Sequence, residues 1–285
     1  MKLLHAAAAL CILAAAPAAH ALDLHEERSS PFDLAVRGAV AGVPEGATRY
    51  ARWSDLRALP TSRISVNGEF IKGVNVVTVV FLSDLWKALP VSADADTVLA
   101  TCTDGYASGY TSGFISTYKP FLILEIDGKG PKDWPPPGQT FNPAPFVITV
   151  APELYAGAPT FLDIEHKKPW SVSTVSFARF SDTYKGIYSG RWASLGPEAA
   201  AGRQIWINSC ASCHSGPKNT FGGTRSERPF PIIAAYAGSA PALFKKYVHN
   251  PKDVVASAAM EAHPWYTEKQ LSDLIAFITS GQQLD

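Results

Sequence analysis

The chain has 285 residues, of which 47% are hydrophobic and 18% charged, and its formal net charge is +0. This length exceeds what one small helical domain needs and suits two domains that each bury an apolar core. A neutral chain lacks the basic field that displaces phosphate counterions, so we expect no nucleic-acid partner.

The N-terminus has the organisation of a secretory signal peptide. Lys2 supplies a positive start, residues 6–16 form an apolar run, and Ala19-His20-Ala21 gives a small-x-small cleavage pattern. The run is shorter than the roughly 20 residues that a membrane helix needs. We therefore expect residues 1–21 to be a cleaved signal peptide, the mature chain to be periplasmic, and no stable membrane insertion after cleavage.

Residues 22–188 are expected to form a β-rich domain with few helices. Short apolar or β-branched runs bounded by turn residues are typical of strands. The predicted strands cover residues 76–80, 97–101, 121–126, 146–150 and 170–175, and a short helix is predicted over residues 84–89. Residues 189–196 are expected to be a linker to the C-terminal part of the chain.

This order of elements resembles part of the sulfite-oxidase-type molybdopterin-binding fold in a reduced form. The resemblance rests on four segments: Gly73-Val74, residues 82–89, Asp104-Gly105-Tyr106 and Asp127-Gly128. It implies an oxidoreductase module. Cys102 does not match the position of the family's metal-binding cysteine, so we transfer no molybdenum ligand and expect no molybdopterin. A degenerate domain used for docking or for shielding a cofactor is the preferred interpretation.

Two potential ligands in this domain receive structural interpretations. Three cysteines remain after the predicted cleavage, an odd number that argues against a disulfide framework. Cys102 is the one outside the C-terminal pair, and we interpret it as a small buried hydrophobe. His166 lies beside Lys167 and Lys168 and is interpreted as a surface residue rather than a metal ligand.

Cys210-Ala211-Ser212-Cys213-His214 is the C-x-x-C-H pattern of covalent haem c attachment. Positions three apart share one helical face, so the sulfurs of Cys210 and Cys213 can both reach one porphyrin edge. His214 follows as the proximal iron ligand. Residues 197–207 predict the preceding helix, with Pro197 at its first position. A zinc site would need a second ligand pair, and a thioredoxin-like dithiol would need a βαβ pattern. The sequence offers neither.

From Pro197 to the C-terminus the chain resembles the class I cytochrome c family. The resemblance includes the loop Gly222-Gly223-Thr224, the proline segment 228–231, and a short helix that ends at Asn250-Pro251. It implies an all-α cytochrome c domain over residues 197–285 with one haem. It also implies a backbone carbonyl on the outer nitrogen of the proximal histidine, for which Pro231 is the candidate and Pro229 the alternate.

The same resemblance suggests a second axial ligand. Met260 is the only methionine left after the predicted cleavage, and it lies between the Asn-Pro turn and the last helix, where the family places its distal methionine. Methionine–histidine ligation raises the reduction potential and leaves no open position on the iron. The family's proline does not follow directly, because Pro264 comes later. His263 therefore stays open as an alternative ligand, with His249 as a weaker one.

The last helix has clear boundaries. Thr267 and Gln270 form a capping box, and Gly281 is a suitable stop. Leu271, Leu274, Ile275 and Ile278 recur at helical spacing and form its core face. In class I cytochromes this helix packs across the first one, and we expect the same here.

The sequence thus predicts an α+β chain, a β-rich N-terminal domain followed by an all-α class I cytochrome c domain. The expected function is a periplasmic electron carrier with one covalent haem, which serves a donor dehydrogenase or a terminal acceptor. An electron-transfer protein or subunit is favoured over a stand-alone enzyme. The alternative is a molybdopterin-type oxidoreductase whose N-terminal module passes electrons to the haem. The sequence does not decide whether Arg225 and Arg228 contact the haem propionates or only solvent.

Overall fold

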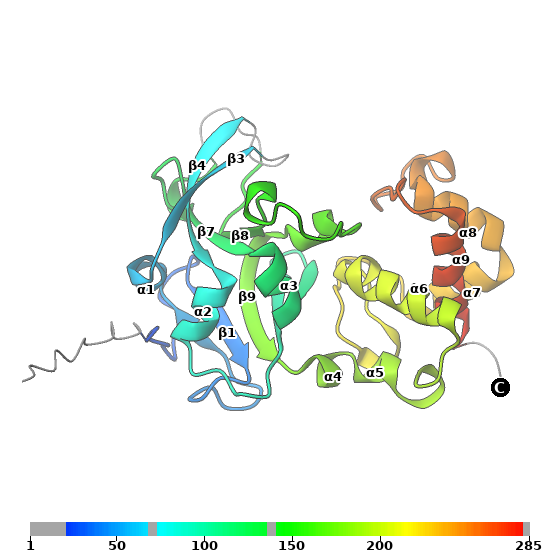
Figure 1. Ribbon diagram of the computed structural model, residues 1–285, viewed down its shortest axis with the longest axis horizontal. Helices are drawn as coiled ribbons and strands as arrows, with labels where there is room; N and C mark the ends of the chain where they lie inside the picture. Colours follow the sequence, from blue (N-terminus) through cyan, green and yellow to red (C-terminus); the bar gives the residue numbers. More distant parts are fainter. Residues whose placement is uncertain (1–20, 68–72, 136–140, 282–285) are drawn as a thin grey trace, which may run out of the picture.

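The computed structural model describes residues 21–67, 73–135 and 141–281. The predicted signal peptide lies, up to residue 20, outside the described residues. Figure 1 shows two parts side by side, a sheet with short helices and a bundle of helices. We refer to the part up to Ala178 as the sheet domain and to the part from Phe180 onward as the helical domain. The predicted fold class, β-rich followed by helical, is confirmed.

Nine strands form one sheet within the described residues, in the order β2-β1-β9-β8-β7-β4-β3, with β5 on β9 and β6 on β5. Their bounds are β1 Leu34–Gly38, β2 Arg49–Ala51, β3 Ser62–Asn67, β4 Val74–Phe81, β5 Thr97–Cys102, β6 Ala107–Thr111, β7 Phe121–Ile126, β8 Phe146–Thr149 and β9 Trp170–Ala178. Strand β9 pairs with β1 in parallel and with β5 and β8 antiparallel. It therefore joins the two halves of the sheet.

Both faces of the sheet are covered, which explains its continuous apolar strands. In β7, Phe121 and Ile123 enter one buried apolar cluster, whereas Leu122 and Leu124 enter the other. A strand that buries both faces reads as an unbroken apolar run rather than an alternating one. The β7 run was predicted at these bounds as an apolar run between turn residues, and the predicted strands over β4, β5, β8 and β9 are also confirmed.

Short helices complete the sheet domain. They are α1 Trp53–Ala58, α2 Leu82–Ala88, α3 Ser112–Tyr118, and the 3-10 turns η1 Pro131–Asp133, η2 Pro152–Leu154 and η3 Ile164–Lys167. Helix α3 begins where the Thr111 side chain accepts a hydrogen bond from the backbone N–H of Phe114 at 3.2 Å, which satisfies one of the free donors of a helix start. Helix α2 was predicted, whereas α1 and α3 were not.

The helical domain contains helices α4 Phe180–Thr183, α5 Lys185–Tyr188, α6 Pro197–Asn208, α7 Phe230–Ser239, α8 Pro241–His249 and α9 Glu268–Thr279. The 3-10 turns η4 Gly190–Trp192, η5 Cys210–Ser212, η6 Pro217–Asn219 and η7 Pro251–Asp253 connect them. A Cβ on Gly202 of α6 would lie 1.9 Å from the carbonyl oxygen of Asp273 in α9. Glycine therefore lets the two helix backbones touch, and the expected packing of the last helix across the first is confirmed.

The predicted start of the last helix is also confirmed. Thr267 and Gln270 form a reciprocal capping box at the start of α9, and Leu271, Leu274 and Ile278 are buried in the helical core. Helix α8 ends at His249 and is followed by its C-cap residue Asn250, because Pro251 cannot continue the helical hydrogen bonds.

The helical core reaches back into the segment expected to be the linker. Trp192, in η4, is 5% exposed and packs in one apolar cluster with Tyr184, Ile187 and Trp206. Residues 184–192 are thus built into the helical domain rather than suspended between two domains. Among the described residues, no helix combines the length and the apolar character needed to cross a membrane.

Candidate functional site

The C-x-x-C-H motif occupies a single turn that continues from helix α6. The helix ends at Asn208, and Ser209 leaves the helical conformation at φ −125° and ψ −70°. Within the turn, the backbone N–H groups of Cys213 and His214 both donate to the Cys210 carbonyl, at 3.2 and 2.9 Å. The motif therefore forms a 3-10 turn of its own after α6, with Cys210 and Cys213 one turn apart.

Both cysteines of the motif are free thiols. Neither forms a disulfide with the other or with Cys102. Burial raises the pKa of Cys213 to about 11, and burial likewise raises the pKa of Cys210. At neutral pH both sulfurs are therefore protonated.

The glycine-rich loop packs directly on the motif. The N–H of Gly223 donates to the Ala211 carbonyl at 2.7 Å. A Cβ on Gly223 would lie 2.1 Å from the Ser212 carbonyl oxygen, and one on Gly222 would lie 2.3 Å from that of His214. Any larger residue would push the loop away from the motif, so the two glycines keep this side of the turn closed.

The Nδ1 atom of His214 points into the protein, toward a backbone carbonyl. This atom is buried without a well-formed hydrogen bond in the described chain. Burial lowers the pKa of His214, and the backbone carbonyl of Arg228 opposes this shift. The prediction of Pro231 for this carbonyl is not supported. Pro231 lies in the first turn of α7 and is exposed, whereas the carbonyl that acts on the His214 ring is that of Arg228, just before the predicted alternate Pro229.

The segment between η7 and α9 brings Met260 and His263 to the helical core. Met260 is half-buried and packs against the apolar cluster that contains Trp206. His263 is buried, and its backbone N–H donates to the Val248 carbonyl at 3.1 Å. His249, the weaker alternative ligand, is exposed at the end of α8 and is not part of this cluster.

His166 is buried against this segment, so its interpretation as a surface residue was wrong. It is 5% exposed, and its Nε2 atom lies 3.2 Å from Nε2 of His263 with the two rings stacked. Its Nδ1 atom shares a hydrogen bond of 2.9 Å with the Tyr106 hydroxyl. Burial lowers the pKa of His166 to about 3 and that of His263 to about 4. Both imidazoles are therefore neutral at pH 7, and one donates to the other.

Further contacts join the sheet domain to the parts of the helical domain that surround the motif. The N–H of Thr224 donates to the Gly105 carbonyl at 2.8 Å, and the Arg225 guanidinium lies 3.4 Å from the Asp104 carboxylate. The Tyr266 hydroxyl donates to the buried carboxylate of Asp163. The sheet domain thus contacts both the glycine-rich loop on the motif and the segment that carries Met260.

Sequence reasoning did not identify Tyr106, Asp163 or His166 as part of the site. The Asp104-Gly105-Tyr106 segment was noted only for its resemblance to the molybdopterin-binding fold, and such a short motif does not reveal what the tyrosine contacts. Cys102, by contrast, has the predicted character: it is 5% exposed at the end of β5, and burial raises its pKa to about 12.

Residues 199–282 match the cytochrome c family. The match covers Cys210, Cys213 and His214 together with Met260 and His263, and this cytochrome c domain implies a covalently bound haem c. A search of curated proteins finds no match for the chain. Among solved structures, the chain is similar to the sulfane dehydrogenase SoxCD of Paracoccus pantotrophus, at 12% identity and a TM-score of 0.36. That similarity covers 54% of this chain and 40% of the other, which is too distant to support an argument.

The residues of the cytochrome c domain fit a covalent haem. Two free thiols and an imidazole lie on one turn, and the imidazole has a buried Nδ1 beside a carbonyl. Such a carbonyl is the usual outer partner that fixes the ring of a ligating histidine.

Proposed function

We propose that the chain is a periplasmic electron-transfer protein that carries one haem c on Cys210 and Cys213, with His214 as the proximal ligand. The observation that carries this proposal is the C-x-x-C-H turn inside the region that matches cytochrome c. A bound haem c would supply a reversible one-electron carrier at this site.

Arg228 rather than Pro231 would orient the proximal histidine. A proton on Nδ1 directed at the Arg228 carbonyl leaves the lone pair on Nε2, the tautomer needed for ligation. Trp206 supports this orientation, because its ring lies 6.2 Å from that of His214 between centroids. The buried packing then holds the imidazole against rotation.

Met260 is the better candidate for the sixth ligand. The Nε2 atom of His263 is engaged with His166 at 3.2 Å, so this nitrogen would have to give up a buried hydrogen bond before it could bind iron. The Met260 thioether is only a weak hydrogen-bond acceptor, so binding of its sulfur to iron would not break a comparable hydrogen bond. A histidine–methionine pair leaves no open position and favours electron transfer over catalysis.

The sheet domain would act as a cover for the haem site. It contributes Asp163 and His166, which contact Tyr266 and His263 of the helical domain, and Tyr106, which forms a hydrogen bond with His166. Because Tyr184 and Ile187 belong to the helical core, we place the domain boundary just after β9, earlier than the expected end at residue 188.

The redox partners would be a donor dehydrogenase or a terminal acceptor. The proposal is tested by expressing the chain with its signal peptide and a haem-maturation system, then measuring iron, molybdenum and haem. We expect one iron per chain, a haem that acid-acetone does not extract, and no molybdenum. Colourless protein, or haem lost to acid-acetone, would overturn the haem assignment. Stoichiometric molybdenum would instead identify the sheet domain as a catalytic module.

A further inference from the structure

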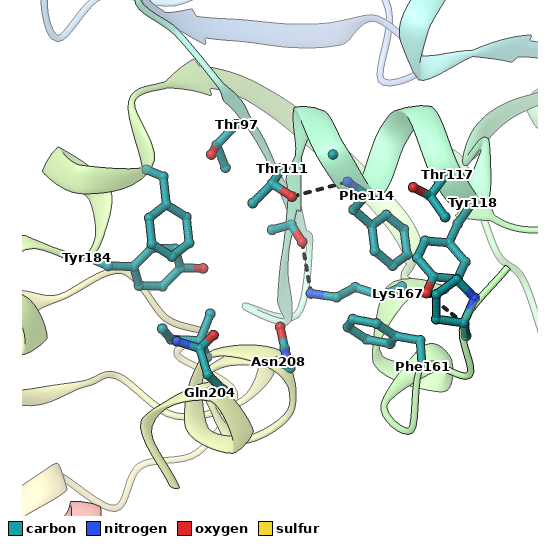
Figure 2. Close-up of a pocket in the computed structure, with 15 residues that line it drawn as sticks. Thr97, Thr111, Phe114, Thr117, Tyr118, Phe161, Lys167, Tyr184, Gln204 and Asn208 are labelled. Atoms are coloured by element: carbon teal, nitrogen blue, oxygen red, sulfur yellow. Dashed lines mark hydrogen bonds between the residues drawn. The ribbon is translucent and has the colours of Figure 1, made fainter. Parts of the chain in front are cut away.

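A second site lies between the sheet domain and helix α6. A cavity of about 450 Å³ opens there, lined by residues of β5, β6, α3 and η3 on one side and by Gln204, Ile207 and Asn208 on the other. Pockets of roughly 300–1,000 Å³ accommodate small organic ligands. Figure 2 shows the Lys167 side chain extending into this space, with Asn208 below it and Tyr184 on the opposite side.

Lys167 is a buried cation in the wall of the cavity. It is 3% exposed, and its Nζ atom donates to the Gly109 carbonyl at 2.8 Å. An ammonium has three donors, so one bond leaves two of them unused. No carboxylate lies within ion-pair distance of Lys167 among the residues that the structure describes. Burying an ammonium without a charged partner is costly.

Aromatic rings surround the ammonium and do not replace a counter-ion. The Nζ atom lies 5.8 Å from the ring centroid of Phe114 and 5.7 Å from that of Phe161. At such distances the attraction of a cation to a ring is at the weak end of its range. Asp163 accepts a hydrogen bond from Tyr266 and acts on Lys167 only through its charge. Burial lowers the pKa of Lys167 to about 8.

The lining selects the charge and the shape of a ligand. It contains one cation and no aspartate or glutamate, and its remaining polar groups are hydroxyls and the amides of Gln204 and Asn208. The rest of the wall is apolar and largely aromatic. A dianion would leave one charge unpaired, and a cation would meet the ammonium directly.

We propose that this cavity binds a small organic monoanion, whose carboxylate pairs with Lys167 and whose apolar body lies among Phe114, Phe161 and Tyr184. The ligand would bridge the two domains, because the wall includes Asn208, two residues before Cys210. This site is separate from the haem ligands and its occupation does not depend on electron transfer.

The test titrates the haem-loaded chain with sodium benzoate by isothermal calorimetry, with benzylamine as the cationic control. We expect one benzoate per chain and no binding of benzylamine. Lys167→Met removes the charge while keeping the length of the side chain, and should weaken benzoate binding about tenfold or more, because a charge-assisted hydrogen bond is lost. The matched control is Lys168→Met, since Lys168 is paired with Glu165 at 2.6 Å and should leave binding unchanged.

A second variant keeps the lysine and fills the cavity. Gly113 lines the cavity, and a Cβ there would meet nothing closer than Thr111 Oγ1 at 3.9 Å, so Gly113→Leu has room for its side chain. We expect it to abolish benzoate binding with an unchanged haem spectrum. The proposal is overturned if benzoate fails to bind the wild-type chain at millimolar concentration, if it binds both variants as tightly as wild type, or if benzylamine binds equally well.

Discussion

The Nε2 atoms of His166 and His263 lie 3.2 Å apart across the boundary between the sheet domain and the helical domain, although the two residues are 97 positions apart in the chain. Each ring is uncharged at neutral pH, because burial lowers both pKa values to about 3 and about 4. A neutral pair can share one proton in a hydrogen bond, whereas two imidazolium ions would repel each other. This bond ties the segment that carries Met260 to the sheet.

Loss of this bond should loosen the attachment of the two domains. In His166→Ala, His263 is left with an unpaired buried nitrogen, which costs roughly 1–3 kcal/mol. We expect the free energy of unfolding in urea to fall by about that amount. The control is His249→Ala, because His249 is exposed at the end of α8. Equal stability of the two variants would show that the histidine pair contributes nothing to the cover.

Covalent haem attachment should depend on the motif cysteines only. Cys213→Ala should leave one thioether bond or no stable holoprotein, measured by haem staining after denaturing electrophoresis. Cys102→Ala is the matched control, since Cys102 is also a buried free thiol but lies in the sheet domain. Its haem stain should equal that of the wild type. The number of thioether bonds follows from the absorption spectrum, because losing one leaves a vinyl group conjugated to the porphyrin and shifts the reduced α-band to longer wavelength. An unshifted α-band with full haem staining in Cys213→Ala would contradict the two-sulfur assignment.

The distal ligand can be identified spectroscopically. Met260→Ala should abolish the weak near-infrared band of methionine ligation and lower the reduction potential, because the thioether ligand raises it. His263→Ala should retain the band, as its ring is engaged with His166. If the band persists without Met260, or disappears only without His263, the distal assignment is wrong.

The glycine-rich loop should tolerate no side chain at its contact with the motif. In Gly223→Ala the new Cβ would lie 2.1 Å from the Ser212 carbonyl oxygen. Overpacking of this kind costs typically about 1–3 kcal/mol, visible as a lower urea midpoint and reduced haem incorporation. Gly196→Ala is the control, because its Cβ would meet only a Glu198 side-chain oxygen at 3.8 Å. A Gly223→Ala chain as stable as this control would exclude a close contact.

Lys167 should make stability depend on pH at the alkaline end. Its pKa is lowered from 10.5 to about 8 in the folded chain, so between these values the unfolded chain holds more protons than the folded one. Stability therefore rises with pH over this window, by up to roughly 3 kcal/mol for a shift of this size. Lys167→Met should remove that slope and be the more stable chain at pH 7. Parallel urea curves of both chains at pH 7.5 and 10 would refute the prediction.

The local elements were predictable because short-range chemistry determines them. The capping box at Thr267 and Gln270 lies within one helical turn, and the apolar run of β7 needs only its own residues. The strands at the edges of the sheet were not predicted. Strand β3 is polar and half-exposed, and it becomes a strand because β4 supplies its partner along six residue pairs. Neither segment considered alone predicts this pairing.

The sequence by itself determined the haem-binding motif, since the spacing of Cys210, Cys213 and His214 is a property of one turn. Only the tertiary structure decided what surrounds it. The carbonyl beside His214 belongs to Arg228 because of how the loop enters α7, and His166 faces His263 because the sheet domain lies against the helical one. Contacts between residues far apart in the chain depend on the packing of whole elements, and no local pattern encodes them.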